Sequence, residues 1–510
     1  MKGAFRVKKK DIKILKKRKQ KIKKRLERQQ WEAQDQPMFS AKNIQYEMAD
    51  RVQAIDCGGI GAFHLLARNS GLIDAINKNL QLLKIHLPYH ESDHVLNIAY
   101  NTLAGGTCLE DIELLRNDES YMDALGTQRI PDPTTAGDFS RRFYESDVLA
   151  LMEAINTVRV KMWNKRLSRS QRAVAIVEAD GSVAPTTGEC KQGMGLSYNG
   201  IWGYHPLMIS LANTLEPLYL VNRPGNRPSH DGAAPWIDRA VSLVRKSFKK
   251  VYVRGDTDFA LTVNFDRWTK DGVGFAFGMD AMPNLVEIAE NLDKKCWGVL
   301  KRRQKNTPKS GKRRRRPPRV KEQIVIENQY KNIKLEKEHV AQFDYQPTKC
   351  KQSYRVVVLR KKLSVEKGQL RLWDDTRYFF YITNIAEMSP AEVVYFCNDR
   401  CNQENLIEQL KNGLNAMRMP VGDLESNWAY MVMCALAWTL KAWFALVVRS
   451  RDGREKLLRM EFRQFLNAIV KVPVQIINAG RQIVYRVLGY NHWTHTFFRT
   501  FDTIRQLRLA

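Results

Sequence analysis

Apolar and β-branched runs divide the central part of the chain into short strands. The run at 173–180, Ala-Val-Ala-Ile-Val-Glu-Ala-Asp, is almost continuously apolar, which is typical of a strand buried on both faces of a sheet. Similar runs at 205–212, 217–222, 251–256 and 273–278 predict four more strands. We expect the second and third runs to be antiparallel partners of the first.

Amphipathic runs with a period of 3.6 residues predict the helices around these strands. Residues 233–248 and 259–270 predict helices inside the strand region. From residue 50 to about 165 the pattern is helical, and the last helix there opens on Thr134 or Thr135, either of which is a good N-cap. The helices expected in this part are 61–70, 72–83, 91–103, 109–116 and 134–144.

Three further helical stretches are expected after residue 390. Residues 391–418 are predicted to form one helix that carries Glu404. Residues 428–449 are almost wholly apolar, but Lys441 lies among them, so we interpret this stretch as a buried helix rather than a membrane span. The tail from 453 to 510 is predicted to be helical and basic.

A large excess of basic residues gives the chain a formal charge of +29 at pH 7. Such an excess implies a polyanionic partner, and nucleic acid is favoured over a membrane surface or an acidic protein. Basic residues cluster in the first 30 positions and in a second run, which we expect to lie along a phosphate backbone. The second run consists of Lys312, Arg313, Arg314, Arg315 and Arg316. For both runs the alternative is a solvated segment without function.

The eight cysteines are scattered and show no zinc-binding spacing. We interpret them as reduced thiols of a cytoplasmic protein. The basic N-terminus is not followed by the apolar segment of a secretory signal peptide, which agrees with that interpretation.

Two of the predicted strands end on aspartates. Asp180 ends the run 173–180, and Asp256 ends the run Val-Tyr-Val-Arg-Gly-Asp at 251–256. Because α/β sheets place their chemistry at the carboxyl ends of strands, we expect the two side chains to meet there. Together with Glu404 they are suited to bind two divalent metals, which activate water and stabilise the leaving oxygen in phosphoryl transfer.

The predicted helix around Glu404 places two basic residues beside this acid. Arg400 lies four residues earlier and Lys411 seven residues later, so both fall within about 40° of Glu404 on a helical wheel. A carboxylate flanked by two cations suits a metal-bound phosphate. The alternative is an amphipathic surface helix with an internal salt bridge.

Breaks in these patterns divide the chain into five parts. Predicted strands at 353–360, 369–373 and 377–383 make the part before the last acid mostly β. Arg141 and Arg142 project from the helical part, which suits binding of DNA ends or dimerisation, or simple packing on the core. The predicted parts are a basic arm (1–49), a helical DNA-binding or dimerisation domain (50–168), an RNase H-like catalytic core (169–280 and 386–425), a β-rich basic insertion (281–385) and a C-terminal helical region (426–510).

Several motifs resemble those of a known transposase family. The spacing of Arg400, Glu404 and Lys411 resembles the Tyr-x2-Arg-x3-Glu-x6-Lys signature of bacterial DDE transposases, with Cys397 at the tyrosine position. An ordered set of motifs over about residues 40–450 resembles the insertion-sequence 1380 family. The motifs are Thr-Thr-Ala-Gly-Asp-Phe-Ser-Arg-Arg-Phe (134–143), Tyr-Asn-Gly-Ile-Trp-Gly-Tyr-His (198–205), Arg-Pro-Gly-Asn (223–226) and Arg-Gly-Asp-Thr-Asp-Phe (254–259).

This resemblance implies an α/β fold with an RNase H-like core of the retroviral integrase superfamily. It implies Asp180, Asp256 and Glu404 as ligands of two Mg²⁺ ions, for which Mn²⁺ substitutes, and Arg400 and Lys411 as phosphate contacts. It further implies cutting of double-stranded DNA at the terminal inverted repeats of an insertion sequence, strand transfer into target DNA, and a synaptic homodimer or larger assembly. No membrane partner is expected.

Other residues compete for roles at this site. Glu178 is expected to be a neighbour of Asp180 rather than a ligand, and Asp258 is a candidate to orient the ligands. His205 is expected to be a hydrogen-bonded structural histidine. Trp373 is expected in the core, with stacking on a flipped base as the alternative.

Two other functions remain open at this point. One is a metal-dependent DNA nuclease without strand transfer, and the other is a non-catalytic DNA-binding protein on the same fold.

Overall fold

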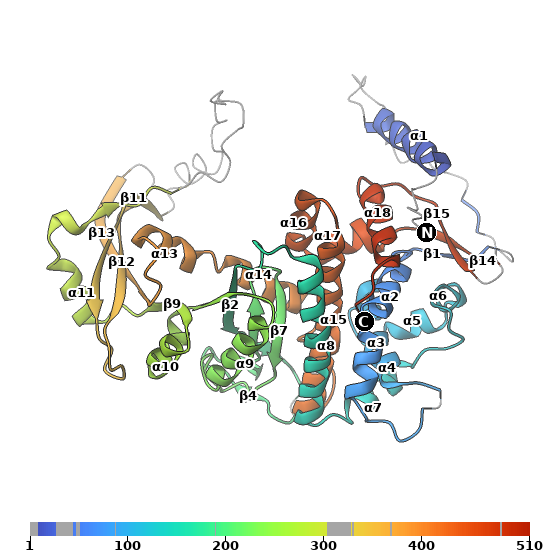
Figure 1. Ribbon diagram of the computed structural model, residues 1–510, viewed down its shortest axis with the longest axis horizontal. Coiled ribbons are helices and arrows are strands. Elements are labelled where there is room, and N and C mark those ends of the chain that lie inside the picture. The colour runs from blue at the N-terminus through green and yellow to red at the C-terminus, as the bar shows by residue number, and fades with distance from the viewer. Residues whose placement is uncertain are drawn as a thin grey trace.

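One mixed sheet runs through the left and centre of the molecule in Figure 1, and helices with the small sheet of β1, β14 and β15 make up the right. This computed structural model describes residues 9–26, 44–46, 52–86, 88–188, 190–302, 328, 331–367, 370–479 and 482–509. Within those residues the sheet has nine strands in the order β10-β11-β12-β13-β9-β8-β2-β6-β7.

The half of the sheet that ends at β7 has the predicted RNase H-like arrangement. β2 pairs antiparallel with β6, which pairs antiparallel with β7, while β8 and β9 run parallel to β2. α9 (Ala233–Arg245) packs against β2, β6 and β8. The bounds of the strands are β2 Val174–Gly181, β6 Leu207–Leu211, β7 Glu216–Val221, β8 Lys250–Gly255 and β9 Val273–Met279. The α/β fold class and the five predicted core strands are therefore confirmed.

The β-rich insertion extends this same sheet. β13 pairs with β9, with Phe380 opposite Met279 and Thr383 opposite Ala276. The insertion begins with the helix α11 (Pro283–Glu290) and continues with β10 Gly298–Val299, β11 Lys331–Tyr345, β12 Tyr354–Lys367 and β13 Leu370–Thr383. The two strands predicted at 369–373 and 377–383 are one strand, β13. The polar residues between them lie in a part of β13 that is largely exposed. The basic run 312–316 lies outside the described residues.

Seven helices of the described chain lie between β1 (Ala54–Ile55) and β2. They are α2 Ile60–Asn69, α3 Leu72–Asn79, α4 Glu91–Ala104, α5 Ile112–Arg116, α6 Glu119–Leu125, α7 Pro133–Ser140 and α8 Glu145–Arg166. The N-cap predicted at Thr134 or Thr135 is wrong. Asp132 is the N-cap of α7, since its carboxylate accepts hydrogen bonds from the backbone N–H and the hydroxyl of Thr135, both at 2.8 Å, and Pro133 takes the first helical position.

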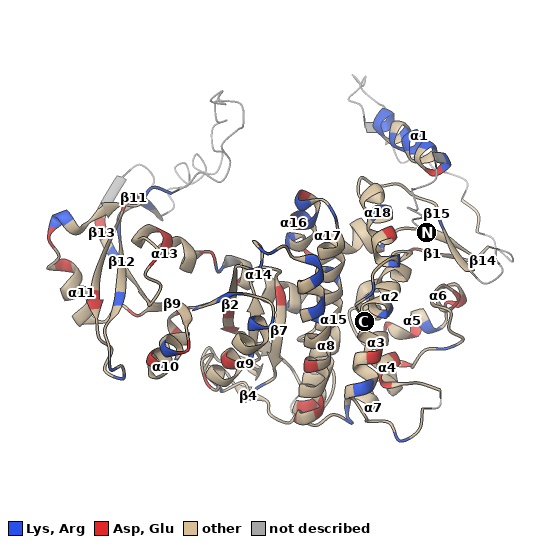
Figure 2. Cartoon of the chain, viewed as in Figure 1, with Lys and Arg blue, Asp and Glu red and all other residues tan. Residues whose placement is uncertain are grey.

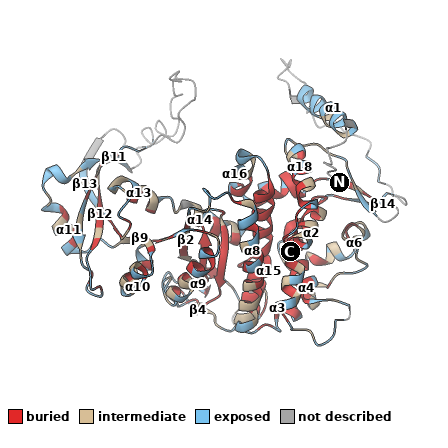
Figure 3. Cartoon of the chain, in the orientation of Figure 1, coloured by how far each residue is buried: buried red, intermediate tan, exposed pale blue. Residues whose placement is uncertain are grey.

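The apolar helix α15 (Leu424–Val447) lies between the sheet and the helices of the N-terminal part, and it is buried along its length (Figure 3). It packs against α2, α4, α8 and β7. By length and composition it is a candidate membrane span, but the apolar window is entirely buried inside the protein. Lys441 is accommodated because its Nζ donates to Leu458 O at 2.9 Å and lies 3.6 Å from the ring centre of Trp438. The interpretation as a buried helix is confirmed.

The C-terminal region is only partly helical. β14 (Val474–Ala479) and β15 (Gln482–Val487) form an antiparallel pair, and β14 also pairs with β1 (Ala54–Ile55). The prediction of a wholly helical tail is therefore wrong at 474–487, where the strand is stabilised by a partner more than 400 positions earlier in the sequence. The helices here are α16 Arg451–Arg459, α17 Phe462–Phe465 and α18 Thr494–Arg505.

The remaining elements are short or peripheral. β3 (Ala184–Pro185), β5 (Trp202–Tyr204) and β4 (Gly195–Leu196) form a small sheet after β2, and α10 (Phe265–Lys270) precedes β9. The basic arm contains α1 (Lys9–Leu26), on which Lys and Arg are concentrated (Figure 2). Arg18 of α1 donates to the backbone oxygens of Val487 and Gly489, at 3.2 and 3.0 Å.

A buried carboxylate at the start of β7 joins the sheet to the helices. Glu216 has no exposed surface and accepts four hydrogen bonds. Trp163 of α8 donates at 2.8 Å, Trp443 of α15 at 2.9 Å, Arg159 of α8 at 3.0 Å and Thr214 at 2.5 Å. Three of these donors are buried side chains of α8 and α15, and the fourth lies two residues before Glu216. The network therefore fixes α8 and α15 relative to β7.

We expect Glu216→Gln to lower the free energy of unfolding by about 3–5 kcal/mol, because Arg159 is then left buried without a counter-charge. Urea unfolding followed by tryptophan fluorescence measures the effect. The control Glu290→Gln, at an exposed position of α11, is expected to change stability by less than about 0.5 kcal/mol. Equal stability of the two variants would contradict the role given to Glu216.

Candidate active site

The parallel pairing of β2 and β8 brings the two predicted aspartates together. Glu178 lies opposite Arg254 in the register of these strands. Asp180 and Asp256 each follow by two residues, so they meet at the carboxyl edge of the sheet. This is the edge at which α/β sheets place their chemistry.

Arg400 lies between these two carboxylates. Its Nη2 is 3.1 Å from Asp180 Oδ2 and 3.4 Å from Asp256 Oδ2. The side chains of Asp180 and Arg400 are 14% and 15% exposed, and that of Asp256 is 36% exposed. One guanidinium nitrogen therefore contacts an oxygen of both acids in a largely buried place.

A second, buried ion pair fixes the backbone around Arg400. Arg254 of β8 contacts Glu178 of β2 through Nη2 at 2.6 Å and Nε at 2.8 Å, and both side chains are almost fully buried. The same guanidinium donates to the backbone oxygens of Phe396 and Asp399, at 2.5 and 3.3 Å. Arg254 therefore ties the strands to the segment that carries Arg400. Glu178 is a neighbour of the site, as expected, and its partner is Arg254.

Burial raises the pKa of both aspartates, and the charge of a neighbouring carboxylate adds to each rise. The pKa of Asp180 rises from 3.8 to about 6, mainly because burial disfavours the charged form; Arg400 opposes the rise and the charge of Asp256 adds to it. The pKa of Asp256 is also raised by burial, again against Arg400 and with a contribution from Asp258. Two carboxylates that repel each other in such a place favour a bound cation.

The helix predicted at 391–418 is broken next to the site. α13 (Pro390–Asn398) ends before Asp399, Arg400 is the N-cap of α14 (Cys401–Glu408), and a π-helical turn follows at Gln409–Gly413. The prediction of a single straight helix, on which the helical-wheel argument depended, is therefore wrong. The bond from Arg254 to Asp399 O lies at this break.

The third predicted acid lies on the exposed face of α14. Glu404 is exposed in the first turn of α14, and its N–H donates to Arg400 O at 3.3 Å. Among the described residues, Asp180, Asp256 and Glu404 are not a group in which one oxygen of each lies within 4.8 Å of the others. The structure brings Asp180, Asp256 and Arg400 together, and Glu404 follows Arg400 by one helical turn in α14.

His205 and Lys411 lie near the same edge. His205 Nδ1 is 2.6 Å from Arg227 O, so it is a hydrogen-bonded structural histidine, as expected. Burial lowers its pKa, and the charge of Lys411 contributes to the lowering. Burial also lowers the pKa of Lys411. Next to Asp180, a Cβ at Gly181 would lie 3.0 Å from His205 Nε2, which explains why a glycine follows the acid.

The remaining predicted residues are distant from this edge in the fold. Arg141 and Arg142 are exposed at the end of α7, where Arg141 pairs with Asp138 at 2.6 Å. Arg142 lines an open groove of about 560 Å³ beside the segment 82–89. Trp373 is 50% exposed, so its expected place in the core is wrong; it lies on the part of β13 beyond the residues that pair with β9.

Sequence reasoning missed the role of Arg254. The available signal was a lone arginine in the otherwise apolar run 251–256. Glu178 takes the matching position in the run 173–180, two residues before the final aspartate. A charge inside a strand buried on both faces requires a partner, and the partner is Glu178.

Neutralising Asp180 is expected to stabilise the metal-free protein at pH 8. Because the folded-state pKa is raised to about 6, the folded protein keeps this proton more tightly than the unfolded chain does. The destabilising charge is absent below about pH 4 and fully present above pH 6. Asp180→Asn should therefore raise the free energy of unfolding on the order of 2 kcal/mol more at pH 8 than at pH 4.

Urea unfolding at both pH values measures this difference. The control Asp271→Asn, at an exposed aspartate just before β9, should change stability little at either pH. A gain for Asp180→Asn that is the same at both pH values would contradict the raised pKa.

Comparison with known proteins places the chain in a family. No curated protein matches the sequence. The chain resembles a piggyBac transposase in a synaptic complex with hairpin DNA, solved by cryo-EM, with 10% identity, a TM-score of 0.34 and coverage of 80% of this chain and 81% of that one. That likeness is too low to carry an argument. A family model, however, matches residues 36–509. The chain therefore belongs to the family described as transposase DDE domain, group 1.

Proposed function

We propose that this protein cuts DNA at the ends of an insertion sequence of the 1380 type and joins the freed ends to target DNA. The family membership supports a transposase. The structural observation that carries the proposal is the pair Asp180 and Asp256, which turn one oxygen each toward a single guanidinium nitrogen at the carboxyl edge of the sheet.

We infer two Mg²⁺ ions, or Mn²⁺ in their place, as cofactors held by Asp180, Asp256 and Glu404. The fit rests on the two aspartates, because hard divalent cations prefer carboxylate oxygens and the point between these oxygens already attracts the cationic Arg400. When bound, such ions stabilise the attacking and leaving oxygens of a phosphoryl transfer. Glu404 is proposed to supply the third carboxylate from the exposed face of α14.

Arg400 is proposed to exchange partners during the reaction. In the structure its charge partly neutralises Asp180 and Asp256. Neutralisation of these acids by a cation releases the guanidinium, which is then placed to bind a phosphate oxygen beside the cut. Lys411, half-buried near His205, is proposed as a second phosphate contact.

The proposed partner is double-stranded DNA, held by a homodimer or larger assembly in the bacterial cytoplasm. The charge of +29 and the basic helix α1 support an extended phosphate contact. Arg141 and Arg142, and the run from Lys312 to Arg316, are proposed to bind DNA away from the cut. A nuclease without strand transfer and a binding-only protein are the outcomes that the experiment separates from this proposal.

Glu404→Gln is expected to reduce cleavage of DNA carrying the element's own ends by at least about 100-fold, since even partners outside the ligand shell cost 10–100-fold. The control is Glu408→Gln, an exposed acid one turn later in α14, which should cleave like the wild type. Asp256→Asn should abolish cleavage, and the wild type should require Mg²⁺ or Mn²⁺. Gel analysis of labelled ends measures the products.

The pattern of products distinguishes the functions. Cleavage followed by joining to target DNA supports the transposase, and cleavage without joining of pre-cut ends indicates a nuclease. Tight binding of the ends without any cleavage indicates a binding protein. If Asp256→Asn and Glu404→Gln both cut as fast as Glu408→Gln, the assignment of this site is wrong.

A further inference from the structure

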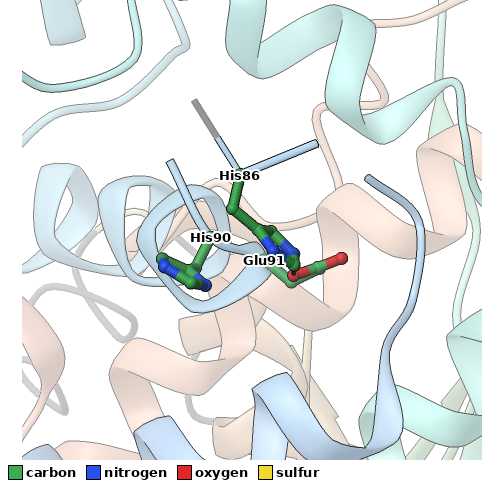
Figure 4. Close-up of side chains that lie close together, drawn as sticks. All are labelled: His86, His90 and Glu91. Atoms are coloured by element: carbon green, nitrogen blue, oxygen red, sulfur yellow. Dashed lines mark hydrogen bonds and ion pairs between the residues drawn. The ribbon is translucent and has the colours of Figure 1, made fainter. Parts of the chain in front are cut away.

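Two histidines and a glutamate gather at the start of α4 (Figure 4), which lies on the opposite side of Figure 1 from the strands β11, β12 and β13. His86 belongs to the segment after α3, His90 is the N-cap of α4, and Glu91 is the first residue of that helix. Their ligand atoms all lie within 4.8 Å of one another. His86 Nε2 is 3.1 Å from Glu91 Oε2, and the rings of His86 and His90 stack with centres 4.4 Å apart.

The glutamate of this cluster is held rigidly by the backbone. Its side chain is 2% exposed, and its Oε1 accepts the backbone N–H groups of Leu82 and Leu83, both at 3.1 Å. Its other oxygen, Oε2, faces His86. The backbone of His90 is fixed in turn, since its N–H donates to Asp93 at 2.8 Å. One carboxylate oxygen is therefore oriented toward the two imidazoles by the fold itself.

The donor set selects a class of metal. Imidazole nitrogens suit zinc and neighbouring transition metals, whereas Mg²⁺ prefers sites made of oxygens alone. Two histidines and a glutamate form a zinc set that leaves a fourth position open. Ligands bound tetrahedrally at about 2.0–2.1 Å lie roughly 3.3 Å apart, close to the 3.1 Å between His86 Nε2 and Glu91 Oε2. The His86 and His90 rings stack with an angle of 14° between their planes, so metal binding requires the exposed His90 side chain to rotate until one of its nitrogens points at the same ion.

We propose that His86, His90 and Glu91 bind one divalent transition metal of the zinc class, separately from the acidic site on the sheet. The fourth position faces solvent, because the His86 side chain is 44% exposed. The bound ion would join His86 to the start of α4. Leu82, Leu83, Lys84 and Ile85, just before His86, line the same groove as Arg142, so the metal would fix that wall of the groove.

The alternative without a metal is a hydrogen bond between His86 and Glu91 with a stacked His90. Metal binding by the full-length chain separates the two. The parent is the Asp180→Asn, Asp256→Asn double variant, which removes the acidic site as a competing ligand. After treatment with a chelator, the protein is titrated with Zn²⁺ against a chromophoric chelator, and Co²⁺ is used as a spectroscopic probe.

We expect the parent to bind Zn²⁺ at one site, and its Co²⁺ form to show the intense visible absorption of a tetrahedral centre with nitrogen ligands. His86→Ala and His90→Ala are each expected to weaken Zn²⁺ binding at least about tenfold, because each removes a ligand. The control His492→Ala, at an exposed histidine after β15, should bind like the parent. Circular dichroism of each variant checks that the helices are intact.

Equal Zn²⁺ affinity in the parent and in a His86→Ala, His90→Ala double variant would overturn the proposal. Absence of the visible absorption from the Co²⁺-loaded parent would overturn it as well, and this second measurement holds even if the alanine variants unfold. The readout is metal binding in a variant that lacks the strand-end aspartates, so its outcome is independent of whether the protein cuts DNA.

Discussion

The buried carboxylate of Glu216 is the interaction that joins the two halves of this molecule. A charge without exposed surface is tolerable only when its oxygens are fully hydrogen-bonded, and the four donors to Glu216 come from α8, from α15 and from the turn before β7. Apolar contacts alone would let α8 and α15 slide on the sheet, because they are not directional. Donors with fixed geometry admit one arrangement, so the sheet and the helical part keep one orientation.

A second buried carboxylate, at the candidate site, plays a similar role. Glu178 and Arg254 form a buried pair between β2 and β8, and the remaining donors of Arg254 bind the backbone at the break between α13 and α14. The pair stabilises the edge where Asp180 and Asp256 meet, and it also sets where α14 begins. Arg400 reaches both aspartates because that helix begins there. The edge where the carboxylates of Asp180 and Asp256 lie close together is therefore stabilised by a neighbouring pair of opposite charges.

Local patterns in the sequence were sufficient to predict the core strands. They were insufficient to predict features that depend on partners far away in the sequence. The strands β2 and β8 are apolar runs that end on aspartates, so both the strands and the meeting of Asp180 with Asp256 follow from periodicity and the parallel register. The break at Asp399 does not, because it depends on hydrogen bonds from Arg254, which lies far away in sequence. The pairing of β14 with β1 and the exposed place of Trp373 depend on tertiary partners in the same way.

The pairing of β13 with β9 makes the order of synthesis matter. Phe275 and Asn384, 109 residues apart in the sequence, share a hydrogen bond at this seam. While a ribosome is still producing the insertion, β8 and β9 are complete, but β9 remains an open edge that is free to pair with another chain. Contacts across such separations form slowly, which lengthens the exposure. Nascent chains that stall within the insertion are thus prone to aggregate through the unpaired edge of β9.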